Sequence, residues 1–199
     1  QAGADGCPAG DREAPQLSLS VRHTRKGEKM YVVKGAFEKF DEVTLHQTIG
    51  SIGVYVIWDD KSDLIPKYIG QGSILKRLCD HNLKFKPPLH GYISILGYED
   101  DKKKNTWKAE AELMEAALLW VAEETGRISK ENRQPARVGI IDKYFNEHGV
   151  IRVSLKDYDP FSPPKASRKL TPDKKIISLR PIGEEEVFIE HSWRRLRGA

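Results

Sequence analysis

The sequence predicts an α+β fold, with a small antiparallel sheet and helices packed against it. Two short runs rich in β-branched and aromatic residues, 52–58 and 66–70, are separated by a polar segment of turn formers, which favours antiparallel pairing. Residues 106–125 predict the longest helix, because apolar side chains recur there at helical spacing and Gly126 follows as a stop. Strands close together in sequence, with helices apart from them, are typical of the α+β class.

The chain before residue 52 predicts a tail followed by strands. Residues 1–15 are rich in Gly, Ala and Pro without periodicity, and we expect a flexible N-terminal tail. Apolar and polar residues alternate over 16–22, which predicts a half-buried strand, and residues 30–33 predict a second short strand. Residues 37–45 fit either a helix or an extended segment.

The chain after residue 70 predicts further helices and strands. Gly70 and Gly72 flank a sharp turn, and Ser73 is suited to cap a helix that begins near Ile74. Residues 91–98 predict the next strand. Later in the chain we expect a helix over 140–147, then strands over 150–155, 176–179 and 186–190.

Composition is that of an ordinary globular protein. The chain has 199 residues, 39% hydrophobic and 31% charged, which is enough for one domain with a full core. Because no apolar run approaches the length of a membrane span and the start of the chain has no signal pattern, we expect a cytoplasmic protein without membrane contact. If the protein is bacterial, we expect it to associate with the nucleoid.

Positive charge is concentrated in one segment near the C-terminal end. The net charge of +4 is a weak pointer to a polyanionic partner, but residues 163–181 carry six cations against the single acid Asp173. The cations are Lys165, Arg168, Lys169, Lys174, Lys175 and Arg180. Such a segment is usually a solvated loop, and on a nucleic-acid enzyme it is also suited to contact the DNA backbone.

Four polar side chains are predicted to meet where the paired strands join the following helix. Tyr55 and Tyr68 lie on the two strands, and Arg77 and His81 lie one turn apart on the helix. The phenols could orient or deprotonate water if a nearby cation lowers a phenol pKa. The arginine offers a bidentate phosphate clamp and the histidine a proton shuttle. These functions fit the hydrolysis of a phosphodiester.

A carboxylate is missing from this group, and the helix over 106–125 supplies candidates. Phosphodiester hydrolysis usually needs a metal held by a carboxylate, and this helix carries Glu110, Glu112 and Glu115. Glu115 shares a helix face with apolar residues, so it borders the core stripe and suits a carboxylate turned into a site. Glu112 lies one turn earlier and is the second choice.

The same residues resemble the signature of the GIY-YIG nuclease superfamily. Gly53-Val54-Tyr55 is followed after twelve residues by Tyr68-Ile69-Gly70, and only the valine departs from the signature. The family also has an Arg in the next helix, often a His four residues later, a Glu in a following helix and an Asn beyond it. The residues that match these positions are Arg77, His81, Glu115 and Asn132.

The resemblance covers roughly residues 52–135 and implies both a fold and a chemistry. It implies a three-stranded antiparallel sheet flanked by helices, with a core at about 50–137 in a single domain spanning 16–199, and strand-forming extensions at 16–49 and 138–199. It also implies one divalent metal, Mg²⁺ or Mn²⁺, held by the Glu. The first Tyr would act as base or water activator with help from the His, the second Tyr and the Arg would position and stabilise the phosphate, and the Asn would support the site.

The resemblance leaves the subclass open. Because the flanks contain no zinc-finger or helix-turn-helix pattern, the chain resembles stand-alone restriction enzymes of the superfamily, which usually cut palindromic sites as homodimers. The alternatives are a toxin nuclease, a structure-selective repair nuclease, or a nucleic-acid binding module without catalysis. The combination of Tyr, Arg and Glu argues against the last, because a binding module has no need of an acid beside phosphate.

Overall fold

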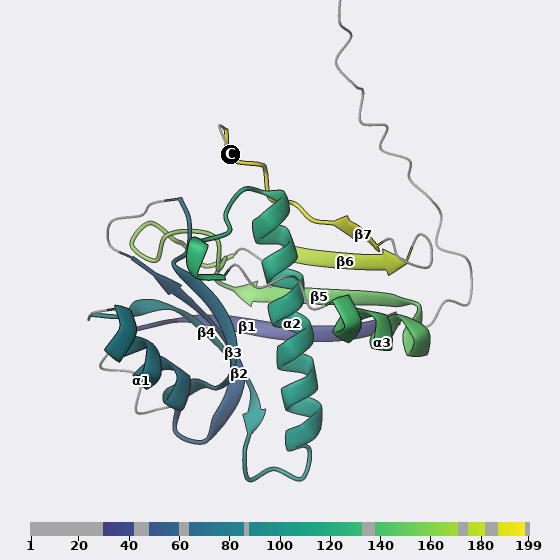
Figure 1. Cartoon of the computed structure of the whole chain (residues 1–199), viewed down its shortest axis with the longest axis horizontal. Helices are drawn as coiled ribbons and strands as arrows, with labels where there is room; N and C mark the ends of the chain where they lie inside the picture. Colours follow the sequence, from purple (N-terminus) through teal and green to yellow (C-terminus); the bar gives the residue numbers. More distant parts are fainter. Residues whose placement is uncertain are drawn as a thin grey trace, which may run out of the picture.

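The protein, described here from a computed structural model, forms an α+β fold built on one mixed sheet. The structure describes residues 30–41, 48–59, 64–85, 88–132, 138–170, 175–181 and 187–197. In these residues seven strands follow the order β3-β2-β4-β1-β5-β6-β7. Three helices, α1 (Ile74–Phe85), α2 (Lys104–Glu124) and α3 (Val138–His148), pack against the sheet within the same described ranges (Figure 1).

One end of the sheet consists of the three strands that the sequence predicts, β2 (Ser51–Trp58), β3 (Tyr68–Ser73) and β4 (His90–Tyr98). Strand β2 lies in the middle and pairs antiparallel with both neighbours. Tyr55 therefore lies opposite Gly70 on one side and Ile93 on the other. The predicted antiparallel pairing of the first two strands is confirmed.

The other end of the sheet makes it larger than predicted. Strand β1 (Met30–Phe40) pairs with β4 at its end and runs parallel to β5 (Val150–Asp157) along its length. Strands β6 (Lys175–Pro181) and β7 (Val187–Glu190) continue this end with antiparallel pairs. The α+β class is confirmed, and the three predicted strands form an antiparallel group within a seven-stranded mixed sheet instead of a small sheet of their own. Strand β1 supplies the partner that the open edge of β4 needs for its backbone groups.

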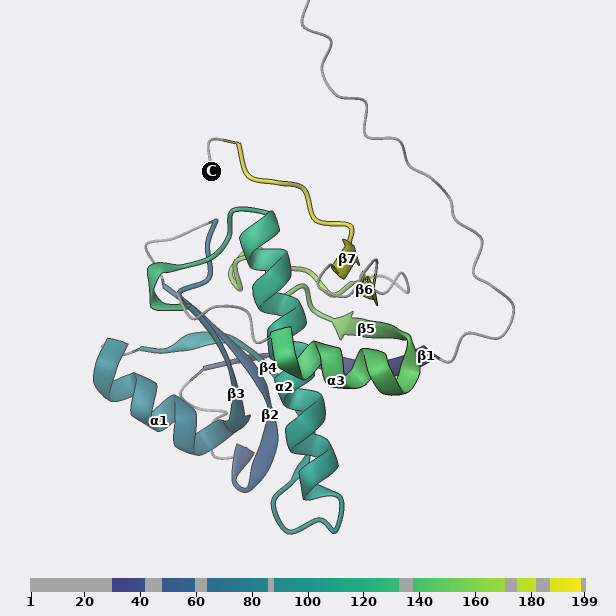
Figure 2. The same cartoon turned by 45° about the vertical axis from the view of Figure 1, so that its right-hand side comes forward.

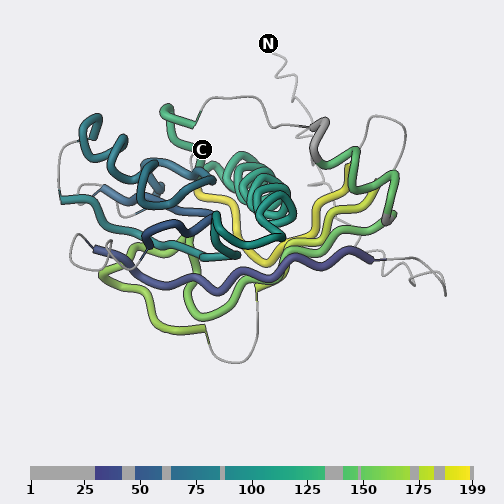
Figure 3. The backbone as a smooth tube through the Cα atoms, turned by 90° about the horizontal axis from the view of Figure 1, so that it is seen from below, coloured from purple at the N-terminus to yellow at the C-terminus, as the bar shows by residue number. Residues whose placement is uncertain are grey.

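Alternation along β2 divides its side chains between two cores. Val54, Val56 and Trp58 lie in the larger core, which α2 and α3 cover. Tyr55 and Ile57 point the other way, into a smaller core with Ile74 and Leu78 of α1. The two ends of the sheet curve around α2, as the tube seen from below shows (Figure 3).

Most predicted elements are present, with shifted bounds. Strand β1 is longer than the predicted 30–33 and runs to Phe40. Of the segment 37–45, which fitted either a helix or an extended chain, residues 37–40 are therefore extended. The tail at 1–15 and the strand at 16–22 lie outside the described residues. Within the described ranges, no helix is both long and apolar enough to cross a membrane.

Candidate functional site

The tyrosine of β2 and the histidine of α1 form a hydrogen-bonded pair beneath the helix. The Tyr55 hydroxyl lies 3.0 Å from Nε2 of His81. The ring of Tyr68, from β3, lies 4.4 Å from the His81 ring and 6.2 Å from the Tyr55 ring, between centroids. Tyr55 is only 2% exposed, so its ring is held by the smaller core while its hydroxyl meets the histidine. The predicted meeting of these three side chains is observed.

Two glycines of β3 make room for this group. A methyl group added at Gly70 would lie 2.5 Å from the Tyr55 hydroxyl oxygen, so only glycine lets the phenol lie across the edge strand. Gly72 has a φ of +123°, a conformation that other residues rarely adopt. A side chain there would meet Nε of Arg77 at 3.6 Å, which places this exposed arginine over the same strand.

Charge and burial set the protonation of the pair. Burial raises the pKa of Tyr55 above its ordinary value of 10, and the nearby charge of Arg77 lowers this pKa only in part. Burial, together with Lys84 and Arg77, lowers the pKa of His81. The sequence-based idea that a cation would lower the phenol pKa is therefore corrected: desolvation outweighs the cation. At neutral pH the pair is a protonated phenol beside a neutral imidazole.

The three glutamates of α2 have different surroundings. Glu115 is half-buried, and its negative charge is among the causes that raise the pKa of Tyr55, so the carboxylate is within electrostatic reach of the phenol. Glu110 accepts a hydrogen bond of 2.9 Å from Tyr31 of β1. Glu110 and Glu112 both act on the pKa of Tyr144 in α3. Of the three, Glu115 is the one whose charge reaches the tyrosine–histidine pair.

Figure 2 shows β3 between α1, which carries Arg77 and His81, and α2, which carries Glu115. Strand β3 is the edge of the sheet, and both helices pack against it. The helix α1 brings Arg77 and His81 to one side of this strand, and α2 brings Glu115 to the other. We call Tyr55, Tyr68, Arg77, His81 and Glu115 the tyrosine cluster.

The donor set of this cluster fits a magnesium ion bound through one carboxylate. In the described ranges no three His, Cys, Asp or Glu side chains are grouped to hold a metal. Mg²⁺ does not require such a cage, because it keeps several waters and binds through one or two carboxylates together with substrate phosphates. Glu115, half-buried and within electrostatic reach of Tyr55, is the carboxylate that would hold it.

Asn132 takes a structural position at the outer edge of β3. Its Nδ2 donates to the Ile69 carbonyl oxygen at 2.7 Å, and its Oδ1 accepts from the Ile69 N–H at 2.8 Å. The side-chain amide thus replaces the neighbouring strand that β3 lacks on this side. Ser129 continues the same edge by donating to the Lys67 carbonyl oxygen. The asparagine fixes the strand that carries Tyr68, and it is 5% exposed.

The cations predicted to contact DNA have different surroundings in the structure: some are exposed and one is held in an ion pair. Lys165, Arg168 and Lys169 are exposed on the segment between β5 and β6, and Lys169 lies 6.0 Å from the ring of Tyr158. Lys175 instead forms an ion pair of 2.5 Å with Asp159, a carboxylate that is only 7% exposed, and lies over the ring of Trp193. Lys174 lies outside the described residues.

Two residues near the cluster were not predicted from the sequence, Lys84 and Phe85 of α1. Phe85 lies parallel to the His81 ring, at 5.0 Å between centroids and 4° between planes, and so fixes the plane of the imidazole. Lys84 lies beside it and lowers the pKa of His81. The spacing of four residues between His81 and Phe85 on one helix is the signal that could have found the aromatic partner.

No protein-family model matches the chain, and comparison with curated proteins and with solved structures finds no match either.

Proposed function

We propose that the protein is a metal-dependent DNA endonuclease that hydrolyses phosphodiester bonds at the tyrosine cluster. The observation that carries this proposal is the hydrogen bond between Tyr55 and His81, beneath a helix that also presents Arg77 and within electrostatic reach of Glu115. A buried phenol, an imidazole, a guanidinium and a carboxylate provide the functions that the reaction needs. The resemblance of the same residues to the GIY-YIG signature supports the proposal.

The protonation of the pair defines a proton path. With its proton on Nδ1, neutral His81 accepts the hydrogen bond of the Tyr55 hydroxyl at Nε2. The phenol oxygen then has lone pairs with which to accept a hydrogen bond from an attacking water. As the water attacks phosphorus, its proton passes to the Tyr55 oxygen while the phenol proton passes to His81. The bond between phosphorus and the leaving sugar oxygen breaks, and that oxygen takes a proton from solvent. A phenolate is never needed, which suits a tyrosine whose pKa is raised by burial.

The other members of the cluster act on the phosphate. Arg77, exposed over Gly72, is suited to bind the non-bridging oxygens and to stabilise the charge that develops in the transition state. Tyr68, beside the His81 ring, positions the imidazole and the substrate. A Mg²⁺ or Mn²⁺ ion held by Glu115 would polarise the phosphate when bound.

A plasmid assay tests the proposal. Supercoiled plasmid is incubated with the protein and Mg²⁺, with Mn²⁺ in place of Mg²⁺, and with EDTA. The Glu115→Gln variant, purified in parallel, reports any contaminating nuclease. Metal-dependent cutting by the wild-type protein alone is the expected result. Absence of cutting with either metal, while DNA is still bound, would instead favour a binding module without catalysis.

Within this proposal, a type II restriction endonuclease that cuts double-stranded DNA as a homodimer is the subclass we infer. Discrete product bands are expected on a plasmid, and sequencing of the product ends should give one repeated site. A smear of products would favour a toxin-type nuclease, and cutting confined to branched or flapped duplexes would favour a repair nuclease.

A further inference from the structure

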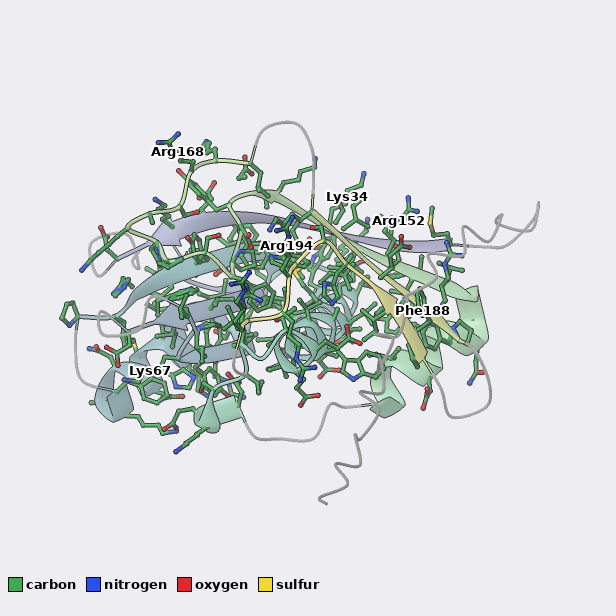
Figure 4. All side chains as sticks on the ribbon, turned by 90° about the horizontal axis from the view of Figure 1, so that it is seen from above. Lys34, Lys67, Arg152, Arg168, Phe188 and Arg194 are labelled. Carbon is green, nitrogen blue, oxygen red and sulfur yellow. The ribbon has the colours of Figure 1, made fainter. Side chains whose placement is uncertain are left out.

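The β1–β5–β6–β7 end of the sheet has one face turned away from the helices. Side chains alternate along these strands, and one set lies in the larger core under α2 and α3. This set includes Val33 of β1, Val153 of β5 and Ile177 of β6. The other set points outward, and Figure 4 shows Lys34 and Arg152 directed away from the helices. We call this outward set the outer face.

The outer face carries four cations from three strands. Lys34 comes from β1, Arg152 and Lys156 from β5, and Arg180 from β6. In the part of the chain that the structure describes, none of the four forms an ion pair, and the Nε atoms of both half-buried arginines are buried without a hydrogen-bond partner. Among the described residues of these strands two acids share the face, Glu38 and Glu190, so cations exceed acids by two there.

Apolar side chains lie between these charges. Val32 of β1 is opposite Arg152, and Phe188 of β7 is opposite Arg180. Phe188 is 49% exposed and Val32 38% exposed. Within the described ranges, the cations beside these apolar groups have no carboxylate partner, and a face of net positive charge attracts a large anionic partner.

We propose that the outer face binds the backbone of a DNA duplex outside the catalytic site, through Lys34, Arg152, Lys156 and Arg180. The inference rests on the proposed function, which supplies DNA as the substrate. A second copy of the chain fits this face less well, because a two-fold interface would bring together two faces that each have a net positive charge.

The spacing of the cations suits a phosphate backbone. Arg152 and Lys156 are four residues apart on one strand, about 13 Å, and β1 and β6 are two strand spacings apart, about 10 Å. A DNA strand advances about 3.4 Å per phosphate along the helix axis, so the patch spans roughly four phosphates.

The outer face is also within reach of DNA held at the tyrosine cluster. The cross-strand row Tyr55, Ile93, Glu38 leads from β2 through β4 to β1, and Lys34 lies four residues from Glu38. Two strand spacings and four residues along β1 give a separation on the order of 16 Å between the backbones of Tyr55 and Lys34. This corresponds to about five base pairs.

Salt dependence of DNA binding tests the inference. Binding of a 30-base-pair duplex, a length chosen as roughly six times the separation above, is measured by fluorescence anisotropy without divalent metal. All variants carry Glu115→Gln to prevent cutting. Replacing Lys34 and Lys156 by Gln removes two phosphate contacts, so the slope of log K against log salt should become shallower by about 1.8. The matched control replaces Lys102 and Lys143 by Gln, two exposed lysines in the loop before α2 and on α3, and should keep the slope.

The outcomes separate the two proposals. A slope that is equal in the face variant and the Glu115→Gln parent, or that falls equally in the control, would overturn the outer face as a DNA contact while plasmid cutting still supports the nuclease. A protein that binds no DNA at any salt concentration would overturn both. Thermal melts of each variant should agree with the parent, because the replaced lysines are at the surface.

Discussion

Two polar clusters in this protein differ in how their groups are satisfied. In the first, the tyrosine cluster, Tyr55 and His81 share one hydrogen bond while burial and neighbouring charges shift both pKa values. In the second, Asp159 accepts hydrogen bonds from the Phe161 N–H, Ser162, Lys175 and Trp193. We call this second group the Asp159 cluster. Its carboxylate is fully engaged by the protein.

This difference predicts that the Asp159 cluster stabilises the fold and that the tyrosine cluster serves the reaction. The Asp159 cluster connects the segment after β5 to β6 and to the C-terminal segment. Its carboxylate already accepts hydrogen bonds from these segments and is not available to bind a substrate. The tyrosine cluster has the exposed guanidinium of Arg77 and the phenol of Tyr55, whose oxygen can accept a further hydrogen bond. Substitutions in the first cluster should therefore change rate more than stability, and substitutions around Asp159 should do the reverse.

The largest effect is expected at Glu115. Glu115→Gln removes the charge that would hold the metal while keeping the shape of the side chain, so cleavage should fall on the order of a thousandfold or more. Plasmid cutting measures the rate, and anisotropy should show DNA binding retained. Glu112→Gln is the matched control on the same helix, and it should cut at the wild-type rate. If the control loses activity and Glu115→Gln does not, the metal ligand is Glu112.

The next largest effect is a loss of stability in the Asp159 cluster. Asp159→Asn removes the buried charge that accepts four hydrogen bonds and leaves the partly buried Lys175 without its charge partner, so the free energy of unfolding should fall by about 3 kcal/mol. Urea unfolding measures the change, with Asp142→Asn on the exposed side of α3 as control. The folded variant should cut DNA normally at low temperature. A loss of activity without a loss of stability would place this cluster in the chemistry.

Tyr55→Phe removes one hydroxyl and keeps the buried ring. Cleavage should fall about a hundredfold, because the water loses its proton path to His81. The free energy of unfolding should change by only about 1 kcal/mol, the net worth of one hydrogen bond. Tyr98→Phe, at a tyrosine that is 48% exposed on β4, is the control. A wild-type rate for Tyr55→Phe would remove the phenol from the proton path.

Asn132 is expected to act through stability. Asn132→Ala leaves the N–H and the carbonyl of Ile69 without partners at a buried edge, at a cost of about 2 kcal/mol in the free energy of unfolding. Thermal or urea unfolding measures it against Asn146→Ala on the exposed side of α3. Unchanged stability together with lost cleavage would show a direct role for the asparagine in the reaction.

The smallest effect concerns pH. The mechanism needs neutral His81, whose pKa is lowered, so activity should persist below the ordinary histidine pKa and be lost as pH falls further. Lys84→Gln removes a positive charge that disfavours protonation, so the pKa of His81 should rise and the acid limb of the rate profile should move to higher pH by roughly a few tenths of a unit. Lys76→Gln, also on α1, is the control. A shift in the opposite direction would contradict the role of His81.

The sequence by itself determined the local elements and the identities of the candidate site residues. Alternation along residues 52–58 placed the Tyr55 side chain on the opposite face of the strand from Val54 and Val56. The i, i+4 spacing placed His81 on the same helix face as Arg77. These features depend on local periodicity, which a single sequence displays. The predicted bounds were accordingly close for β2 and α2, and α1 begins at the predicted Ile74.

The tertiary structure alone decided what depends on contacts distant in sequence. The parallel pairing of β1 with β5 joins segments more than a hundred residues apart, and local patterns do not encode such a pairing. The ion pair of Lys175 with Asp159 and the raised pKa of Tyr55 each depend on which elements pack together. Burial and charge are properties of the folded surroundings, so the protonation of the site follows from the packing of α1 and α2 on β3.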